Sequence, residues 1–152
     1  MPVEKLRSFL DEHHVKYVSI RHSPAYSAQM VAAIAHIPGQ ELAKTVIVKI
    51  DGEYAMAVLP ASFRVHLGHL KQAAGADLVE LAEESEIRDL FPDCEMGAMP
   101  PFGNLYGMDV YVGEQLTEDE EIAFSAGSHR ELVRMAYSDY ETLVAPTIVA
   151  LT

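Results

Sequence analysis

The sequence has few of the features that mark several protein classes. Its 152 residues include one cysteine, Cys94, so no disulfide can form within the chain. It contains no run of eighteen apolar residues, and we therefore expect no membrane span and no membrane partner. The first residues, MPVEKLRSFLDEHH, carry acids and bases every few positions and lack the apolar stretch of a signal peptide. We expect a cytoplasmic protein.

Cationic residues are also scarce. Eleven Lys and Arg stand against 23 Asp and Glu, which gives a formal net charge of −12 at pH 7. A field of that sign repels phosphate backbones at long range, so we expect no DNA partner and no broad nucleic-acid surface. A local neutral or basic groove can still bind one chain end, because screened fields fade over about 8 Å at physiological ionic strength.

The motifs of cofactor and metal chemistry are missing. The sequence has no GxGxxG, P-loop, HExxH or GxSxG pattern. His66 and His69 stand three apart on a predicted helix, but no third ligand at zinc spacing accompanies them. We interpret both as surface residues and expect neither a metal nor a cofactor.

The composition favours one folded domain. Hydrophobic residues make up 49% of the chain and charged residues 22%, which is enough apolar surface to exclude intrinsic disorder. No internal repeat, low-complexity tract or linker divides the sequence. We therefore expect a single mixed α+β domain over residues 1–152.

Hydrophobic spacing predicts the secondary structure. Asp51-Gly52 between two apolar runs indicates a tight hairpin, with strands at 44–50 and 53–59 that are covered on both faces. The other expected elements are helices at 3–14, 27–35, 62–74 and 81–91, a helix that starts at a Ser128/Glu131 capping box and includes 132–135, a further helix start at Ser138, and strands at 17–21, 108–112 and 122–125.

Lys44 opens the first strand of the hairpin. The residues that follow it, Thr45 to Val48, are apolar or β-branched, so its ammonium group lies at the edge of the expected core. Such a lysine either extends to water or faces a polar cavity. In the second case it acts as a fixed point charge for an anionic or carbonyl oxygen, and burial lowers its pKa.

Two glycine-containing segments are candidates for ligand contact. Residues 97–107 hold two prolines and three glycines, which indicates either a shaped loop that presents backbone groups to a ligand or a rigid crossover. Residues 125–129 (SAGSH) predict a strand-to-helix turn whose N–H groups could bind an anion or a developing oxyanion. His129 falls in the first turn of that helix, where a solvent-facing position is the alternative.

The three motifs in this order resemble one family. Ala43-Lys44-Thr45-Val46, Gly97-Ala98-Met99-Pro100-Pro101-Phe102-Gly103 and Ala126-Gly127-Ser128-His129 are similar to the YbaK/EbsC family. That family belongs to the superfamily of the editing domain inserted in bacterial prolyl-tRNA synthetase and its free-standing ProXp relatives. The resemblance covers essentially the whole chain, and it implies a central mixed, mainly antiparallel sheet flanked by helices.

The resemblance also implies an activity, hydrolysis of the ester that joins a wrongly attached amino acid to the 3′ end of a tRNA. For several members the resemblance implies a positioned water and the ribose hydroxyl of the substrate, with no side-chain nucleophile. Carried over by motif, Lys44, Gly97 and His129 are the expected catalytic residues. The expected substrate-binding residues are Thr45, Met30, Ile34, Ala98, Met99, Pro100, Pro101, Phe102, Gly103, Gly127 and Ser128.

The resemblance narrows the substrate and partners as well. Alanine, serine and threonine are the usual range of the family, and we place alanine on tRNA(Pro) first. The expected partner is the acceptor end of an aminoacyl-tRNA, with an aminoacyl-tRNA synthetase as a second. Arg130 and Arg134, one turn apart on the predicted helix, are candidates for phosphate contacts, although a solvated helix face explains them equally well.

Other functions use the same residues. A non-catalytic module that binds a nucleotide or an amino-acid-like metabolite would need the same pocket, and so would an interaction protein for a synthetase. A thiol hydrolase would pair Cys94 with His129, provided that the fold brings them together.

Overall fold

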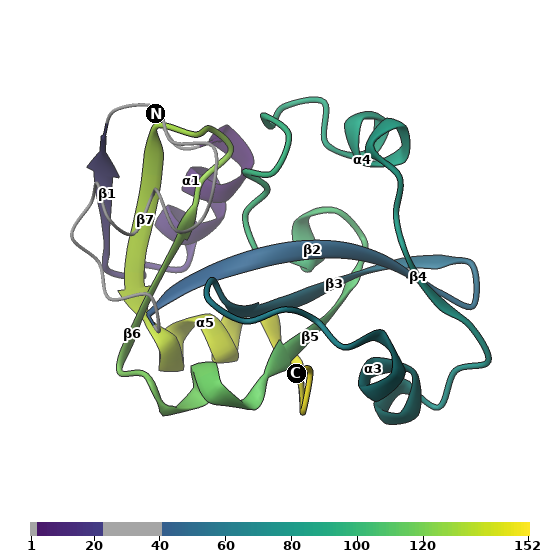
Figure 1. The fold of residues 1–152 in the computed structure, drawn as a ribbon. Coiled ribbons are helices and arrows are strands. Elements are labelled where there is room, and N and C mark those ends of the chain that lie inside the picture. The colour runs from purple at the N-terminus through teal and green to yellow at the C-terminus, as the bar shows by residue number, and fades with distance from the viewer. Residues whose placement is uncertain (1–2, 23–40) are drawn as a thin grey trace.

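The centre of the fold is the predicted hairpin. The computed structural model describes residues 3–22 and 41–152 (Figure 1). Strand β2 (Leu42–Ile50) pairs with β3 (Glu53–Pro60) from Ala43 to the turn. Asp51 and Gly52 have φ angles of 51° and 85°, as the tight turn requires. The hairpin prediction is confirmed.

The strands form one mixed sheet. Its order is β1-β7-β6-β2-β3-β5-β8, and β4 pairs separately with β2. The pairs β1–β7, β6–β7, β2–β3 and β2–β4 are antiparallel, while β2–β6, β3–β5 and β5–β8 are parallel. The prediction of an α+β domain with a mixed, mainly antiparallel sheet is confirmed. The bounds are Tyr17–Arg21 for β1, Val79–Leu81 for β4, Asp109–Gly113 for β5, Glu121–Ser125 for β6, Glu131–Ala136 for β7 and Thr147–Val149 for β8.

Helices lie on both sides of the hairpin. In Figure 1, α4 lies above β2 and α3 below it. The helix expected at the N-terminus is confirmed, with Leu6 and Leu10 fully buried on its inner face. The helix predicted at 27–35 lies outside the described residues. The bounds are Glu4–Glu12 for α1, Leu67–Ala74 for α3, Glu84–Leu90 for α4 and Tyr137–Val144 for α5.

Two apolar clusters cover the two faces of the hairpin, as expected. The larger cluster contains Ile47 of β2 and Val58 of β3 together with Phe102 and Tyr140. The smaller cluster contains Val48 and Leu59 of the hairpin together with Leu70 of α3 and Leu151. Since neighbouring residues of a strand point to opposite faces, the two clusters divide β2 by odd and even positions.

The helix predicted from the Ser128/Glu131 box is wrong. Residues Glu131–Ala136 form β7, which lies between β1 and β6 and pairs with both. The capping box is a local preference only, whereas two ladders of hydrogen bonds and the burial of Leu132, Val133 and Met135 stabilise the strand. Tertiary pairing decides the conformation here.

Other boundaries also differ from the prediction. The region expected to be helical at 81–91 begins as β4, which pairs with β2, and α4 starts only at Glu84. There Glu83 and Glu86 form a reciprocal capping box. The helix expected from Ser62 begins at Leu67, and the short C-terminal strand β8 was not predicted.

Gly103 tests how tightly the segment after the prolines is packed. A Cβ atom there would lie 2.4 Å from the carbonyl oxygen of Met108, a backbone atom that cannot rotate away. We expect Gly103→Ala to lower the free energy of unfolding by about 1–3 kcal/mol, measured by urea denaturation. Asn104→Ala, an exposed position in the same 3₁₀ turn, is the control. Equal urea midpoints for the two variants would contradict this packing.

Candidate functional site

Two of the three sequence motifs meet through backbone hydrogen bonds. The loop of residues 95–98 and the turn of residues 126–129 exchange two bonds, from Glu95 N–H to Gly127 O and from Gly127 N–H to Ala98 O, both 2.8 Å long. Gly97 and Gly127 have φ angles of 85° and 102°, which favour glycine. We call this pair of segments the loop–turn junction.

Side chains add two further bonds to the junction. The Nε2 atom of His129 lies 2.6 Å from the carbonyl oxygen of Met96. Because a carbonyl only accepts, this nitrogen carries the proton and the ring holds the loop in place. The backbone N–H of His129 donates to Oε1 of Glu95 at 2.6 Å. His129 is thus a positioning residue of the junction.

Sequence reasoning missed Glu95. Its carboxylate accepts a backbone N–H of the turn, and its own N–H donates to the turn as well. An acidic residue beside a glycine-rich loop was the available signal, because a carboxylate is a strong acceptor for the bare N–H groups of such segments.

The proline-rich part of the 97–107 segment belongs to the core. Ala98 is fully buried, and Met99 and Phe102 belong to the larger cluster. The hydroxyl of Tyr140 donates to Pro101 O at 2.7 Å, which ties the segment to α5. These residues therefore support the junction from below, while Gly97 is exposed at its surface.

The sheet has a gap that begins near the end of β6, the strand that leads into the 126–129 turn. On the side of β2 opposite β3, β6 pairs only with Leu42 and Ala43, and β4 pairs only with Val48–Ile50. Between these contacts, residues 44–47 have no strand neighbour on that side within the described chain. We call residues 44–47 the open edge of β2.

Thr45 presents its backbone to this gap. The carbonyl of Glu41 accepts from Ala123 on the β6 side, and that of Ile47 accepts from Ala82 on the β4 side. Backbone groups alternate in direction along a strand, so the N–H and C=O of Thr45 point the same way as these two carbonyls. The open edge thus offers one donor and one acceptor at Thr45.

Lys44 and Thr45 lie on opposite faces of the sheet. Thr45 pairs with Val58 of the larger cluster, which also contains Met99 and Phe102. Lys44 pairs with Leu59 of the smaller cluster. Among the described residues, no hydrogen bond or ion pair joins Lys44 to the loop–turn junction.

Lys44 is partly buried and has a second cation nearby. Burial, and to a lesser degree the charge of Arg64, lowers the pKa of Lys44 below its ordinary value. In residues 3–22 and 41–152, no carboxylate lies within ion-pair distance of Lys44 or Arg64. No carboxylate of the described residues therefore neutralises the ammonium group.

The sequence predicted that residues 125–129 lead into a helix whose N-terminus could bind an anion, and that helix is absent. The 126–129 turn connects two antiparallel strands, and the N–H of Gly127 is used by the loop. Arg134 lies in β7 and not on the predicted helix, and its guanidinium nitrogens lie 3.4 Å from Glu41 and 3.6 Å from Glu121, so its charge is paired with two carboxylates.

Several predicted residues lie apart from the junction or outside the described chain. Met30 and Ile34 are outside the described residues. His66 and His69 stack with ring centroids 3.8 Å apart, and His69 bonds to the carbonyl of Thr152. No group of three potential metal ligands occurs in the part of the chain that the structure describes.

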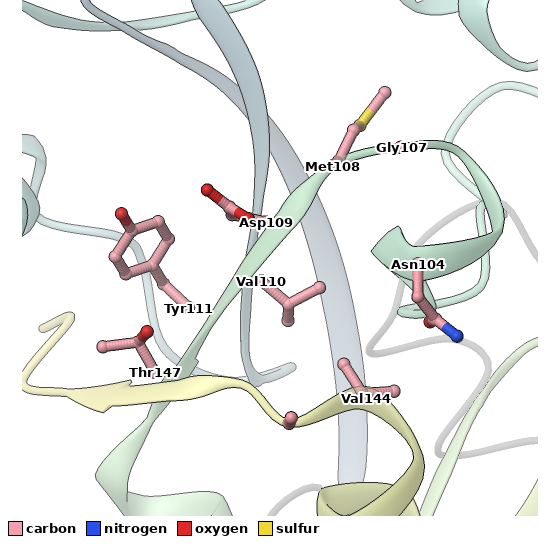
Figure 2. A pocket seen from close by; sticks show the side chains of 9 residues that line it. Asn104, Gly107, Met108, Asp109, Val110, Tyr111, Val144 and Thr147 are labelled. Carbon is pink, nitrogen blue, oxygen red and sulfur yellow. The ribbon is translucent and has the colours of Figure 1, made fainter.

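Hollows of the surface border the junction. One of about 100 Å³ lies between α4 and the loop, and a wider one of about 370 Å³ lies between the loop and the 126–129 turn. A separate pocket of about 410 Å³ is lined by residues of β5, α5 and β8 and by no residue of the first or third motif. Figure 2 shows that the side chains of Val110 and Val144 point toward one another in this pocket. The lining residues of the junction hollows are Ile87, Arg88, Phe91, Cys94, Glu95, Met96 and Met99 for the first and Val3, Pro92, Asp93, Cys94, Glu95, Ala126, Gly127 and Ser128 for the second.

Cys94 lies in both hollows but is a poor nucleophile. Burial raises the pKa of its thiol to about 11, and the Tyr106 hydroxyl 3.6 Å away offsets this only in part. The Nε2 atom of His129 donates its hydrogen bond to the carbonyl oxygen of Met96 and not to the thiol of Cys94. These contacts disfavour a thiol hydrolase.

The raised pKa of Cys94 predicts slow alkylation. At pH 7.5 the thiolate fraction is about a hundredfold smaller than that of an ordinary cysteine, because the pKa is higher by about two units. We expect iodoacetamide to react with the folded protein about a hundredfold more slowly than with the urea-unfolded protein. Similar rates in the two states would show that the thiol is activated.

The bond between Glu95 and His129 predicts local protection of the turn. Glu95→Ala removes the acceptor of the His129 N–H, whereas Glu95→Gln keeps an amide oxygen at the same place. We expect amide hydrogen exchange at His129 to become about tenfold faster in Glu95→Ala and to change much less in Glu95→Gln. Unchanged exchange in Glu95→Ala would show that the carboxylate does not hold the turn.

No helix in residues 3–22 and 41–152 has the length and apolar character needed to cross a bilayer.

Solved structures share the fold. One is a hypothetical protein with a TM-score of 0.87 and 18% identity, and the match covers 97% of this chain and 99% of the other. Another is a candidate trans-editing enzyme for prolyl tRNA synthetase with a TM-score of 0.83 and 20% identity, and the match covers 99% of this chain and 96% of the other.

Sequence comparison identifies the family. The proline–tRNA ligase of Bacillus cytotoxicus is 32% identical over 73 residues, which are 48% of this chain and 13% of the ligase. The chain thus spans a small part of the curated relatives it matches. The family model of the aminoacyl-tRNA editing domain matches residues 22–143. Because this match covers well over half of the sequence, the chain belongs to the aminoacyl-tRNA editing domain family.

Proposed function

We propose that the protein deacylates mischarged aminoacyl-tRNA in trans. The substrate would be a small amino acid, alanine, serine or threonine, on a non-cognate tRNA, with alanine on tRNA(Pro) favoured. Membership of the editing-domain family supports the reaction class. The observation that carries the proposal is the loop–turn junction, which holds an exposed Gly97 in a fixed conformation.

The proposed reaction needs positioning more than strong bases. An aminoacyl ester is already activated, so a held water and stabilisation of the oxyanion suffice. The water oxygen bonds to the ester carbonyl carbon, and the bond from that carbon to the ribose oxygen breaks. The proton that the water gives up ends on the ribose oxygen, assisted by the neighbouring ribose hydroxyl, and the products are the free amino acid and the tRNA.

Each part of the candidate site has a proposed role. Gly97 lacks a side chain, which lets the aminoacyl group approach the backbone of the loop. Thr45 offers backbone N–H and C=O groups at the open edge to the substrate. His129 keeps the loop in place through Met96, and Lys44 binds a phosphate of the terminal nucleotide. Its lack of a carboxylate partner in the described chain supports this last role.

The partner would be the acceptor end of the tRNA. A chain with net charge −12 lacks the cations for a broad duplex surface, since each phosphate contact requires one. The similarity to proline–tRNA ligases supports tRNA(Pro) and makes that synthetase a second candidate partner. Such a role in translation would place the protein in the cytoplasm.

A deacylation panel tests the proposal. Purified tRNA(Pro) charged with alanine, serine, threonine or proline is incubated with the protein, and the remaining ester is measured over time. We expect alanyl-tRNA(Pro) to be hydrolysed fastest and prolyl-tRNA(Pro) to be spared. Saturable binding of alanyl-tRNA(Pro) without turnover would reject the enzyme and favour a non-catalytic binding module.

Lys44→Ala tests the role of the ammonium group in the same assay. We expect kcat/KM to fall about a hundredfold or more, with an unchanged melting temperature. Lys16→Ala, which removes an exposed cation from the connection between α1 and β1, is the matched control. Retained activity in Lys44→Ala would remove this residue from the mechanism.

A further inference from the structure

The segment between β3 and α3, residues 61–66, carries an exposed aromatic ring and an exposed cation. Phe63 is 39% exposed, and Arg64 follows it. Ala61 N–H donates to Leu42 O at 2.8 Å, and His66 N–H donates to Leu151 O at 2.5 Å. Both ends of the segment are therefore fixed to the sheet region, and the two exposed side chains lie on an anchored backbone.

This segment lies beside Lys44. Lys44 pairs with Leu59, the residue before the last one of β3, and the 61–66 segment begins directly after that strand. In Figure 1 this part of the chain leaves β3 and passes along β2 toward α3. Arg64 is close enough to Lys44 for its charge to act on the ammonium group. The two cations thus lie near one another beside the open edge, and Phe63 directly precedes Arg64 in the same anchored segment.

Some cations of this acidic chain are paired with carboxylates, whereas among the described residues others, such as Lys44, Arg64 and Lys16, are not. Lys49 pairs with Glu86 at 3.2 Å, and Arg134 pairs with Glu41 and Glu121. Lys44 and Arg64 have no carboxylate within ion-pair distance among the described residues. Two like charges held near one another without a counter-ion bind an anion favourably, because the anion relieves their repulsion.

We propose that Lys44, Phe63 and Arg64 form a binding surface for the single-stranded 3′ end of the tRNA, from the phosphate of the terminal adenosine to the nucleotides that precede it. This inference rests on the proposed function and names how its substrate is held. The two cations bind successive phosphates, and the ring of Phe63 stacks on a base. Cations that follow the backbone, together with an aromatic platform, are the usual means of binding single strands without reading their sequence.

The size of the surface favours a single strand over a duplex. A duplex surface needs many phosphate contacts, and the described chain offers two free cations here. The surface also lies next to Thr45, whose backbone faces the gap where the aminoacyl end is proposed to bind. A strand whose 3′ end occupies that gap therefore meets Lys44 first and the 61–66 segment next.

Two substrates of different length test the proposal. One is full alanyl-tRNA(Pro), and the other is the alanyl ester of adenosine alone, which lacks the preceding nucleotides. We expect Arg64→Gln and Phe63→Ala each to raise KM for the tRNA about tenfold and to leave hydrolysis of alanyl-adenosine unchanged. Arg64→Gln should also reduce the slope of log KM against log salt by about 0.7.

Matched variants separate stacking from other effects. Phe63→Tyr keeps the ring and should behave like the unmodified protein, whereas Phe63→Leu keeps apolar bulk and should behave like Phe63→Ala. Lys16→Gln removes an exposed cation elsewhere, and Leu78→Ala removes an exposed apolar side chain that is 58% accessible. Both should leave KM for the tRNA unchanged.

The outcomes distinguish this proposal from the proposed function. Equal losses on both substrates, or no loss on the tRNA, would overturn the binding surface while the deacylase stands. If the unmodified protein hydrolyses neither substrate, the proposed function fails. The surface is then tested by fluorescence anisotropy with a labelled single-stranded RNA that ends like a tRNA, and equal affinities for the unmodified protein and Arg64→Gln would overturn it.

Discussion

The loop–turn junction is the constraint on which the rest of the site depends. Residues 95–98 and 126–129 are about thirty positions apart in sequence, and neither segment is a regular helix or strand. Their backbone groups would be unsatisfied if the segments separated, so the two bonds between Glu95, Gly127 and Ala98 fix both at once. The buried prolines and Phe102 below then prevent the loop from adapting, which keeps Gly97 at the surface in one conformation.

The gap in the sheet begins near the end of β6, the strand that leads into this junction. Strand β2 is paired along its whole length on one side but changes partner on the other, from β6 to β4, and leaves Thr45 between them. Strand alternation then sends Thr45 toward the larger cluster and Lys44 toward the 61–66 segment. In the proposed reaction, one strand would supply backbone groups to an ester and a side-chain cation to a phosphate, because the side chains of consecutive residues point to opposite faces of a sheet.

Local chemistry explains which parts were predictable from sequence. The Asp51-Gly52 turn and the spacing of Leu6 and Leu10 act within a few residues, so the hairpin and α1 follow from the sequence. The Ser128 box is equally local but misleading, because β7 is stabilised by β1, more than a hundred residues earlier in the chain. The contact of Glu95 with His129 and the pairing of Arg134 with Glu41 depend on the same long-range arrangement, which no spacing rule contains.

The net negative charge of the chain is compatible with a tRNA partner, because salt screens the repulsion between charges that are far apart. At physiological salt, charges beyond about 8 Å are largely screened, so the negative surface has little effect on a phosphate already in contact with a cation. The carboxylates act instead on the approach of the duplex, which carries many phosphates and finds few cations to receive them. Under the proposed function, a protein of this charge would select for a ligand that presents a short single-stranded end. Lys44 and Arg64, which have no carboxylate within ion-pair distance among the described residues, are where we propose that such an end is held.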